Sequence, residues 1–138
     1  TLPGAQAGDA VSLKLLRSAF TKGLEALTVE VLSAAEQRGV REEFYGVLAD
    51  IDEGSLPRYL ETLIQTHLVH AERRRREVIE VRRQFDAAGM PSDVLPGVEA
   101  AFARTVAALA SAPPGAQASS VAGALQWLIA ARPGCPFP

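Results

Sequence analysis

The sequence contains few cysteines, few aromatic residues and little net charge, and each shortage narrows the class of protein. The single cysteine, Cys135, excludes an internal disulfide and is consistent with a reducing cytoplasm. Aromatic residues make up only 6% of the chain, so the core should consist mainly of Leu, Val and Ala. A formal net charge of −2 gives no overall attraction to nucleic acid or to an anionic membrane. We therefore expect a cytoplasmic protein with no nucleic-acid or membrane partner.

Several features that bind cofactors or cross membranes are also missing. No apolar run approaches the roughly 18 residues of a membrane span, and no segment resembles a signal peptide. The chain contains no glycine-rich phosphate loop of the GxGxxG or GxxxxGK type. His67 and His70 are three residues apart, but no Asp, Glu or Cys accompanies them at metal-ligand spacing. We expect no metal site, and either histidine could contact substrate or pack in the core.

Helix-forming residues dominate what is present. Ala, Leu, Glu and Arg are abundant and β-branched runs are scarce, which favours helix throughout the chain. A chain of 138 residues is long enough for one domain with one core. We predict an all-α fold of about five helices around a long first helix. The predicted helices cover residues 9–38, 41–51, 57–88, 92–111 and 121–131.

The ends of these helices carry recognisable signals. Asp9 is a reasonable N-cap for the first helix, and Gly39 is placed to end it. Ser55, shortly before Pro57, marks the start of the third helix. That helix runs for about thirty residues without a breaker until Gly89, which is long for a globular protein. We therefore expect a kink within it, near residues 67–70.

The first helix combines an apolar stripe with a lysine. The stripe, which we expect to be buried, consists of Leu13, Leu16, Phe20, Leu24, Leu27, Val31 and Ala34. Lys14, Ser18 and Lys22 follow one another at four-residue spacing and lie close to one face of the helix. Lys14 has two interpretations: it extends its amine to water beside the core, or it donates and accepts a proton in a reaction.

A run of four arginines, Arg73 to Arg76, stands between Glu72 and Glu77. Four consecutive side chains spread around the whole circumference of a helix, so they do not form one basic patch. Glu72 and Arg76 have the i,i+4 spacing of a helical ion pair. We therefore favour a solvated, salt-bridged helix or a subunit rim. Nucleic-acid binding through residues 73–83 is the weaker alternative, and it would require a steep salt dependence.

Five residues of the first helix, Gly8, Lys14, Ser18, Glu30 and Gly39, fit a known pattern without a gap. In this pattern the segment resembles the first helix of the C-terminal domain of the β-hydroxyacid dehydrogenases. That family includes 3-hydroxyisobutyrate dehydrogenase and is related to 6-phosphogluconate dehydrogenase and the imine reductases. The Thr21-Lys22-Gly23 sequence is similar to that of an uncharacterised bacterial branch. The resemblance extends to about residue 110.

The resemblance implies a fold like the 6-phosphogluconate dehydrogenase C-terminal domain and a role for several residues. Lys14 would be the catalytic general acid/base, and Ser18, which stands where the family has Asn, would bind substrate with Thr21 and Lys22. Arg76 and Glu77 fall where a Lys–Asp pair is usual and would brace the cleft between domains. The cofactor would be NAD or NADP, bound mainly by an upstream Rossmann domain. The family also implies a small-molecule substrate and a homodimer.

The resemblance also implies a domain plan. Residues 1–8 would be a linker from the missing dinucleotide-binding domain, 9–131 the helical substrate and dimerisation domain, and 132–138 an irregular tail. The opening TLPGAQAG supports a C-terminal piece of a longer protein. The alternative is a free-standing helical interaction module with no catalysis. An upstream strand–GxGxxG–helix unit would favour the enzyme, and a Met directly before Thr1 would favour the module.

Overall fold

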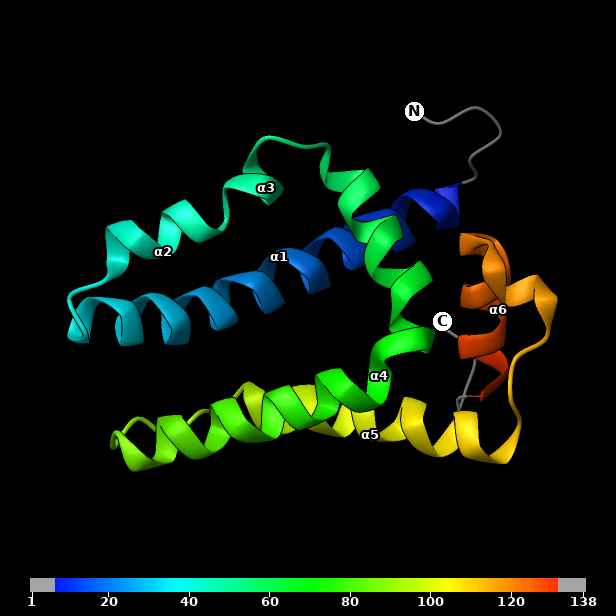
Figure 1. The fold of residues 1–138 in the computed structure, drawn as a ribbon. Helices are drawn as coiled ribbons and strands as arrows, with labels where there is room; N and C mark the ends of the chain where they lie inside the picture. The colour runs from blue at the N-terminus through cyan, green and yellow to red at the C-terminus, as the bar shows by residue number, and fades with distance from the viewer. Residues whose placement is uncertain (1–6, 132–138) are drawn as a thin grey trace. The chain divides into compact units, whose positions relative to one another are not determined.

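The computed structural model describes residues 7–131, which form six α-helices and one short 3₁₀-helix, with no strand in that range (Figure 1). The predicted all-α class with a long first helix is confirmed. The chain divides into two compact units, residues 1–44 and 45–138, and each is described by itself. The elements are α1 (Ala7–Gln37), α2 (Arg41–Val47), α3 (Ala49–Asp52), α4 (Leu56–Ala87), α5 (Leu95–Ser111), η1 (Ala116–Ser119) and α6 (Val121–Ala131).

Helix α1 begins earlier than its sequence indicates. Asp9 does not cap the helix, because α1 already includes Ala7 and Asp9 lies within the first turn. A carboxylate there still interacts favourably with the positive end of the helix dipole. At the other end, Gly39 has a left-handed backbone with φ of 70°. The amide of Val40 donates to the carbonyl of Ala35 at 2.9 Å, which closes the helix as predicted.

The apolar stripe of α1 is not buried as expected. The side chains of Leu16, Phe20 and Leu24 are 52%, 45% and 52% exposed, and Leu13 is exposed as well. Burial in this helix is confined to Ala34 and Ala35 near its end. The correction has a simple physical reason: no other described residue of the first unit covers the stripe. The periodicity of the sequence identifies an apolar face but not the surface that would cover it. No helix in residues 7–131 combines the length and apolarity needed to cross a membrane.

The predicted helix 41–51 is two helices, α2 and α3, which makes one more helix than expected. The amide of Leu48 donates to the carbonyl of Tyr45 at 3.1 Å, three residues back, so the α-helical pattern breaks there. Leu48 has φ of −97° and ψ of 5°, outside the helical region. Gly46, one turn before α3, lowers the helix propensity of this segment.

Helix α4 begins where its sequence predicts. The Ser55 hydroxyl accepts a hydrogen bond from the amide of Arg58 at 3.4 Å, and Pro57 lies in the first turn. Figure 1 shows that α4 bends about midway along its length, as its sequence predicts. The hydroxyls of Thr62 and Thr66 each donate to the carbonyl one turn earlier, at 3.0 Å and 2.8 Å. Such contacts often bend helices.

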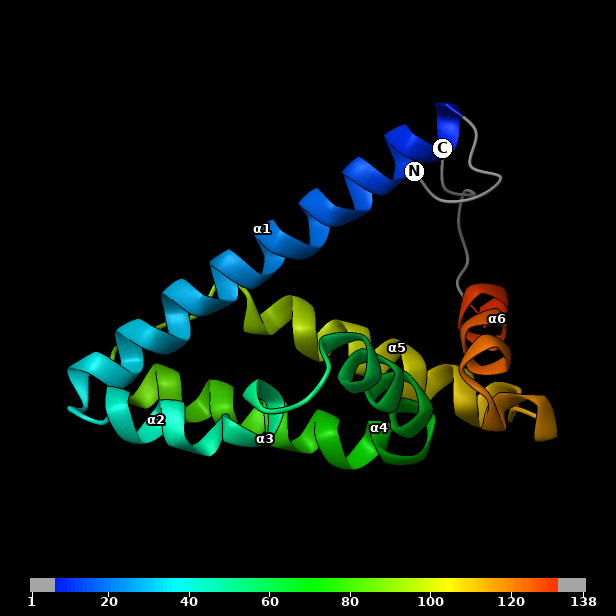
Figure 2. The ribbon, with the colours of Figure 1, turned by 90° about the horizontal axis from the view of Figure 1, so that it is seen from above.

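Helix α5 runs antiparallel beside the second part of α4 (Figures 1 and 2). It begins at Leu95, three residues after the predicted start. The Ser92 hydroxyl accepts hydrogen bonds from the amides of Val94 and Leu95 and so forms a turn ahead of the helix. An ion pair between Arg82 and Glu99 links the two helices. Small residues occupy the buried positions of this unit, namely Ala71, Thr105, Gly123 and Ala124.

Helix α6 contacts both α4 and α5 and has the bounds predicted from the sequence. The loop before it contains the short helix η1. Trp127 on α6 is half-buried, and its indole Nε1 donates to the carbonyl of Ala112 at 3.2 Å. This contact connects α6 to the end of α5.

Replacing Gly89 with Ala is expected to lower the free energy of unfolding by about 1 kcal/mol, since an L side chain disfavours a left-handed backbone. Gly89 has φ of 73°, and no heavy atom lies within 4 Å of the position a Cβ would take, so backbone strain alone produces the loss. Gly89→Asn is the control, because Asn tolerates this conformation better. Urea denaturation followed by circular dichroism measures both variants. Equal losses for Ala and Asn would contradict the explanation.

Candidate functional site

The residues that the sequence singles out on α1 share a face that is opposite the apolar stripe. Lys14, Ser18, Thr21 and Lys22 lie within about 100° of one another around the helix axis. Lys14, Ser18 and Lys22 are exposed, and Thr21 is partly so. Their proximity follows from helical spacing, as predicted for Lys14, Ser18 and Lys22.

One hydroxyl on this face already donates its proton within the helix. The Thr21 hydroxyl donates to the carbonyl of Arg17 at 2.9 Å, so toward a substrate it offers its oxygen as an acceptor. The face has apolar neighbours, since Val11 and Leu15 are 60% and 52% exposed beside Lys14. Helix α1 therefore exposes apolar side chains on both sides, a composition typical of helices that are covered all round.

The arginine run is a set of ion pairs along one helix. Glu72 accepts hydrogen bonds from Arg75 at 3.0 Å and from Arg76 at 3.2 Å, and these bonds lower the pKa of Glu72 to about 2. Glu77 pairs with Arg73 at 2.8 Å. The predicted salt-bridged helix and its Glu72–Arg76 pair are confirmed. Arg76 and Glu77 thus have separate partners within α4, and their role between domains stays a prediction.

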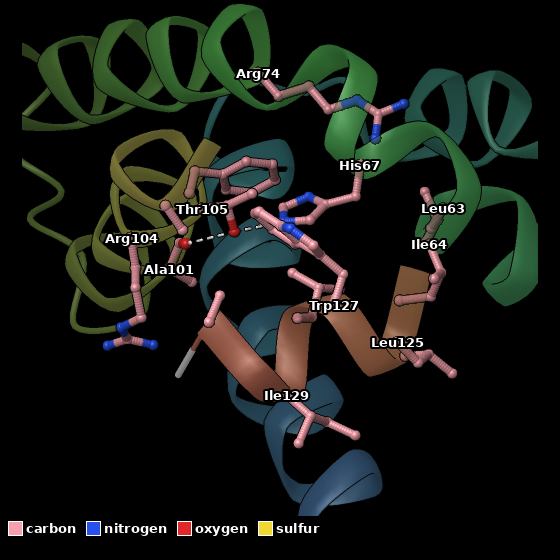
Figure 3. Close-up of a pocket in the computed structure, with 14 residues that line it drawn as sticks. Leu63, Ile64, His67, Arg74, Ala101, Arg104, Thr105, Leu125, Trp127 and Ile129 are labelled. Atoms are coloured by element: carbon pink, nitrogen blue, oxygen red, sulfur yellow. Dashed lines mark hydrogen bonds between the residues drawn. The ribbon is translucent and has the colours of Figure 1, made fainter. Parts of the chain in front are cut away.

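A cavity of about 420 Å³ lies among α4, α5 and α6 (Figure 3). Its walls are mainly apolar, with Leu63 and Ile64 from α4, Phe102 from α5, and Trp127 and Leu128 from α6. The volume is within the range of small-molecule sites, about 300–1,000 Å³. Every residue that lines it belongs to the second unit.

One polar contact crosses the cavity wall. His67 Nε2 on α4 and Thr105 Oγ1 on α5 are hydrogen-bonded at 2.8 Å, and Figure 3 shows the Thr105 hydroxyl also bonded to the carbonyl of Ala101. The His67 ring meets Phe102 edge-on, with ring centroids 5.1 Å apart. Burial, and secondarily the charge of Arg74, lowers the pKa of His67. The imidazole is therefore neutral at pH 7.

Two arginines flank the cavity, Arg74 from α4 and Arg104 from α5 (Figure 3). Arg74 donates to the Thr66 hydroxyl at 2.8 Å. Within residues 7–131 neither arginine has a carboxylate at ion-pair distance. This contrasts with the other arginines of the run, which each pair with a glutamate. None of the described residues that line the cavity is acidic.

The sequence did not reveal this cavity. His67 was noted only as a residue that contacts substrate or packs, and it packs against Phe102. Thr105 stands 38 residues from its partner, a pairing that no local pattern indicates. The one signal in the sequence was Arg104, which stands in a mainly apolar helix with no acidic residue three or four positions away. Among the residues described, no group of three His, Cys, Asp or Glu side chains lies close enough to hold a metal ion.

An all-α domain of this kind has a match among known families. A family model described as a domain of unknown function, DUF1932, matches residues 35–105. The match covers just over half of the chain, and the chain belongs to this family, a C-terminal domain found in 3-hydroxyisobutyrate dehydrogenase-like proteins. The matched span begins at Ala35, after Lys14 and Ser18, and so leaves their roles untested.

One similar curated protein comes from Methanothermus fervidus and is described as "Uncharacterized 28.5 kDa protein in 7S RNA 5'region". It is 30% identical over 80 residues, which cover 58% of this chain and 32% of the relative. The chain thus spans about a third of the length of this relative. No solved structure matches the chain.

Proposed function

We propose that this chain is the C-terminal substrate-binding and dimerisation domain of a cytoplasmic NAD(P)-dependent oxidoreductase resembling the 3-hydroxyacid dehydrogenases, in their bacterial branch. The observation that carries the proposal is its membership of a domain family found in 3-hydroxyisobutyrate dehydrogenase-like proteins. The exposed amine of Lys14, with Ser18 and Lys22 on the same helix face, supplies the chemistry.

The proton step belongs to Lys14. An alkoxide that develops on the substrate needs a nearby proton donor, and a lysine ammonium provides both the proton and a positive charge. In the reverse direction the neutral amine accepts the hydroxyl proton. The Ser18 hydroxyl orients the substrate oxygen, and the Thr21 oxygen accepts a hydrogen bond from a substrate hydroxyl. Lys22 binds the substrate anion two turns along the helix.

Residues 7–131 contain no site of the usual kind for the dinucleotide. Residues 7–131 form no strand, glycine loop and helix of the kind that holds a dinucleotide pyrophosphate. A dinucleotide held by a further domain would supply the hydride donor or acceptor for the substrate carbon. Arg76 and Glu77 would brace the cleft to that domain.

The exposed faces of α1 support a partner on each side. The stripe that includes Leu16, Phe20 and Leu24 is suited to a second copy in a homodimer. The opposite side, with Val11 and Leu15 beside Lys14, is suited to the upstream Rossmann domain and the substrate. Covering both sides would remove the large apolar exposure that a single soluble helix rarely retains.

The test is the mass, oligomeric state and activity of the native protein. Intact mass spectrometry of the protein from its source cells should give a species much larger than 14.6 kDa, with a dinucleotide-binding domain ahead of Thr1. Light scattering should give twice that mass. This 138-residue chain alone should show no nicotinamide-linked turnover. A native product that begins at Thr1 would favour the interaction module, and turnover by this chain alone would overturn the domain plan.

A further inference from the structure

We infer that the cavity among α4, α5 and α6 binds a small monocarboxylate with an apolar body. The site goes beyond the proposed function, because its walls come only from the second unit and its occupancy requires no proton transfer at Lys14. The domain would then have a ligand site in its second unit in addition to the proposed substrate site on α1.

The apolar walls select the body of the ligand. Phe102, Trp127 and Leu128 present two aromatic rings and an aliphatic side chain to the same space. The His67 ring, which is uncharged at pH 7, lines the same space. An aromatic or branched aliphatic group loses contact with water on all of these surfaces.

The unpaired arginines select the head of the ligand. Arg74 lies close enough to His67 for its charge to act on the ring, and its single hydrogen bond to Thr66 leaves other guanidinium N–H groups available. Arg104 adds a second positive charge at the rim, and no acidic residue among the lining residues opposes an anion. A planar carboxylate matches the guanidinium geometry.

The same walls argue against phosphate. A phosphate dianion is strongly hydrated, and most of its oxygens would lie against apolar side chains that offer no donor. A carboxylate places its two oxygens on an arginine and leaves the rest of the molecule apolar. The charge and the lining of the cavity therefore favour the monocarboxylate.

Trp127 provides the measurement, because it is the only tryptophan of the chain and lines the cavity. Its fluorescence is titrated with phenylacetate and with phenylacetamide, which is the uncharged analogue. Acetate, which has the carboxylate but no aromatic group, and inorganic phosphate are titrated in the same way. We expect a saturable change with phenylacetate and at least about tenfold weaker binding of phenylacetamide, since the charge-assisted hydrogen bond is lost. Acetate and phosphate should bind more weakly still.

Matched variants locate the site. Arg74→Gln should weaken phenylacetate binding about tenfold, whereas Arg83→Gln, which removes the same charge from an exposed position of the same helix, should leave binding unchanged. Ala108→Leu should abolish binding by filling the cavity. Arg104→Gln, at an exposed position, replaces Arg74→Gln if circular dichroism shows that the latter is unfolded.

Three results would overturn the inference. Equal affinities for phenylacetate and phenylacetamide would show a merely apolar pocket, and equal losses in Arg74→Gln and Arg83→Gln would show non-specific charge attraction. A fluorescence change that depends on protein concentration and not on phenylacetate would make a second copy of the chain the occupant.

Discussion

Replacing Lys14 with Ala should lower kcat for nicotinamide-linked turnover about a thousandfold, the usual contribution of general acid–base catalysis. The enzyme to use is the longer polypeptide of the proposed function, in which a dinucleotide-binding domain would precede this chain. Because Lys14 is exposed on α1, the substitution should leave the unfolding midpoint unchanged. Steady-state kinetics and thermal denaturation measure the two effects separately.

Lys22→Ala is the matched control for Lys14→Ala. It removes the same charge from the same face of α1, eight residues along, but Lys22 is proposed to bind the substrate anion in the ground state and the transition state alike. Its loss should therefore raise KM with little change in kcat. Added methylamine should restore part of the turnover to Lys14→Ala and none to Lys22→Ala. An unchanged kcat in Lys14→Ala would make Lys14 a surface lysine.

The largest stability effect should come from Gly123→Ala, which we expect to lower the free energy of unfolding by about 3 kcal/mol through overpacking. Gly123 is buried in the first turn of α6, and a Cβ there would overlap the backbone carbonyl of Gln117 in η1. The obstacle is main chain: the Gln117 carbonyl accepts a hydrogen bond from the Ser120 hydroxyl at 3.2 Å, and that hydroxyl accepts one from the Gly123 amide at 3.0 Å. A rotamer change cannot relieve the overlap.

Gly97→Ala is the control for Gly123→Ala. Gly97 is the third residue of α5, as Gly123 is of α6, but no heavy atom lies within 4 Å of its Cβ position. Alanine there should stabilise the protein, because it forms helix better than glycine by about 1 kcal/mol. Urea denaturation followed by Trp127 fluorescence, which senses α6 directly, measures both. Destabilisation of equal size in the two variants would contradict a close approach at Gly123.

Much of the helical framework was predictable because its signals are local. Ser55 and Pro57 begin α4, and Gly39 and Gly89 take the left-handed backbone that ends a helix. The break at Leu48 was missed, since it depends on one change in hydrogen bonding within an otherwise helical segment. The start of α5 was also missed, because the Ser92 hydroxyl forms a turn before the helix instead of capping its predicted first residue.

Of the two candidate sites, one was predictable from local sequence signals and the other was not. The Lys14 face follows from four-residue spacing, and a helix places such residues together wherever it lies. The cavity depends on three helices that meet, and on a hydrogen bond between His67 and Thr105 across 38 residues. Spacing along one helix contains no information about a contact of that kind.

By itself, the sequence determined the all-α class, most helix ends, the charge pairing of the arginine run and the shared face of Lys14, Ser18 and Lys22. These properties depend on backbone propensity and on neighbours within a few residues. The tertiary structure alone decided that the stripe of α1 is exposed and that Gly123 contacts η1. It also decided that Arg74 and Arg104 flank one apolar cavity. Burial and long-range contact depend on how separate helices pack, which is set by the free energy of the whole unit.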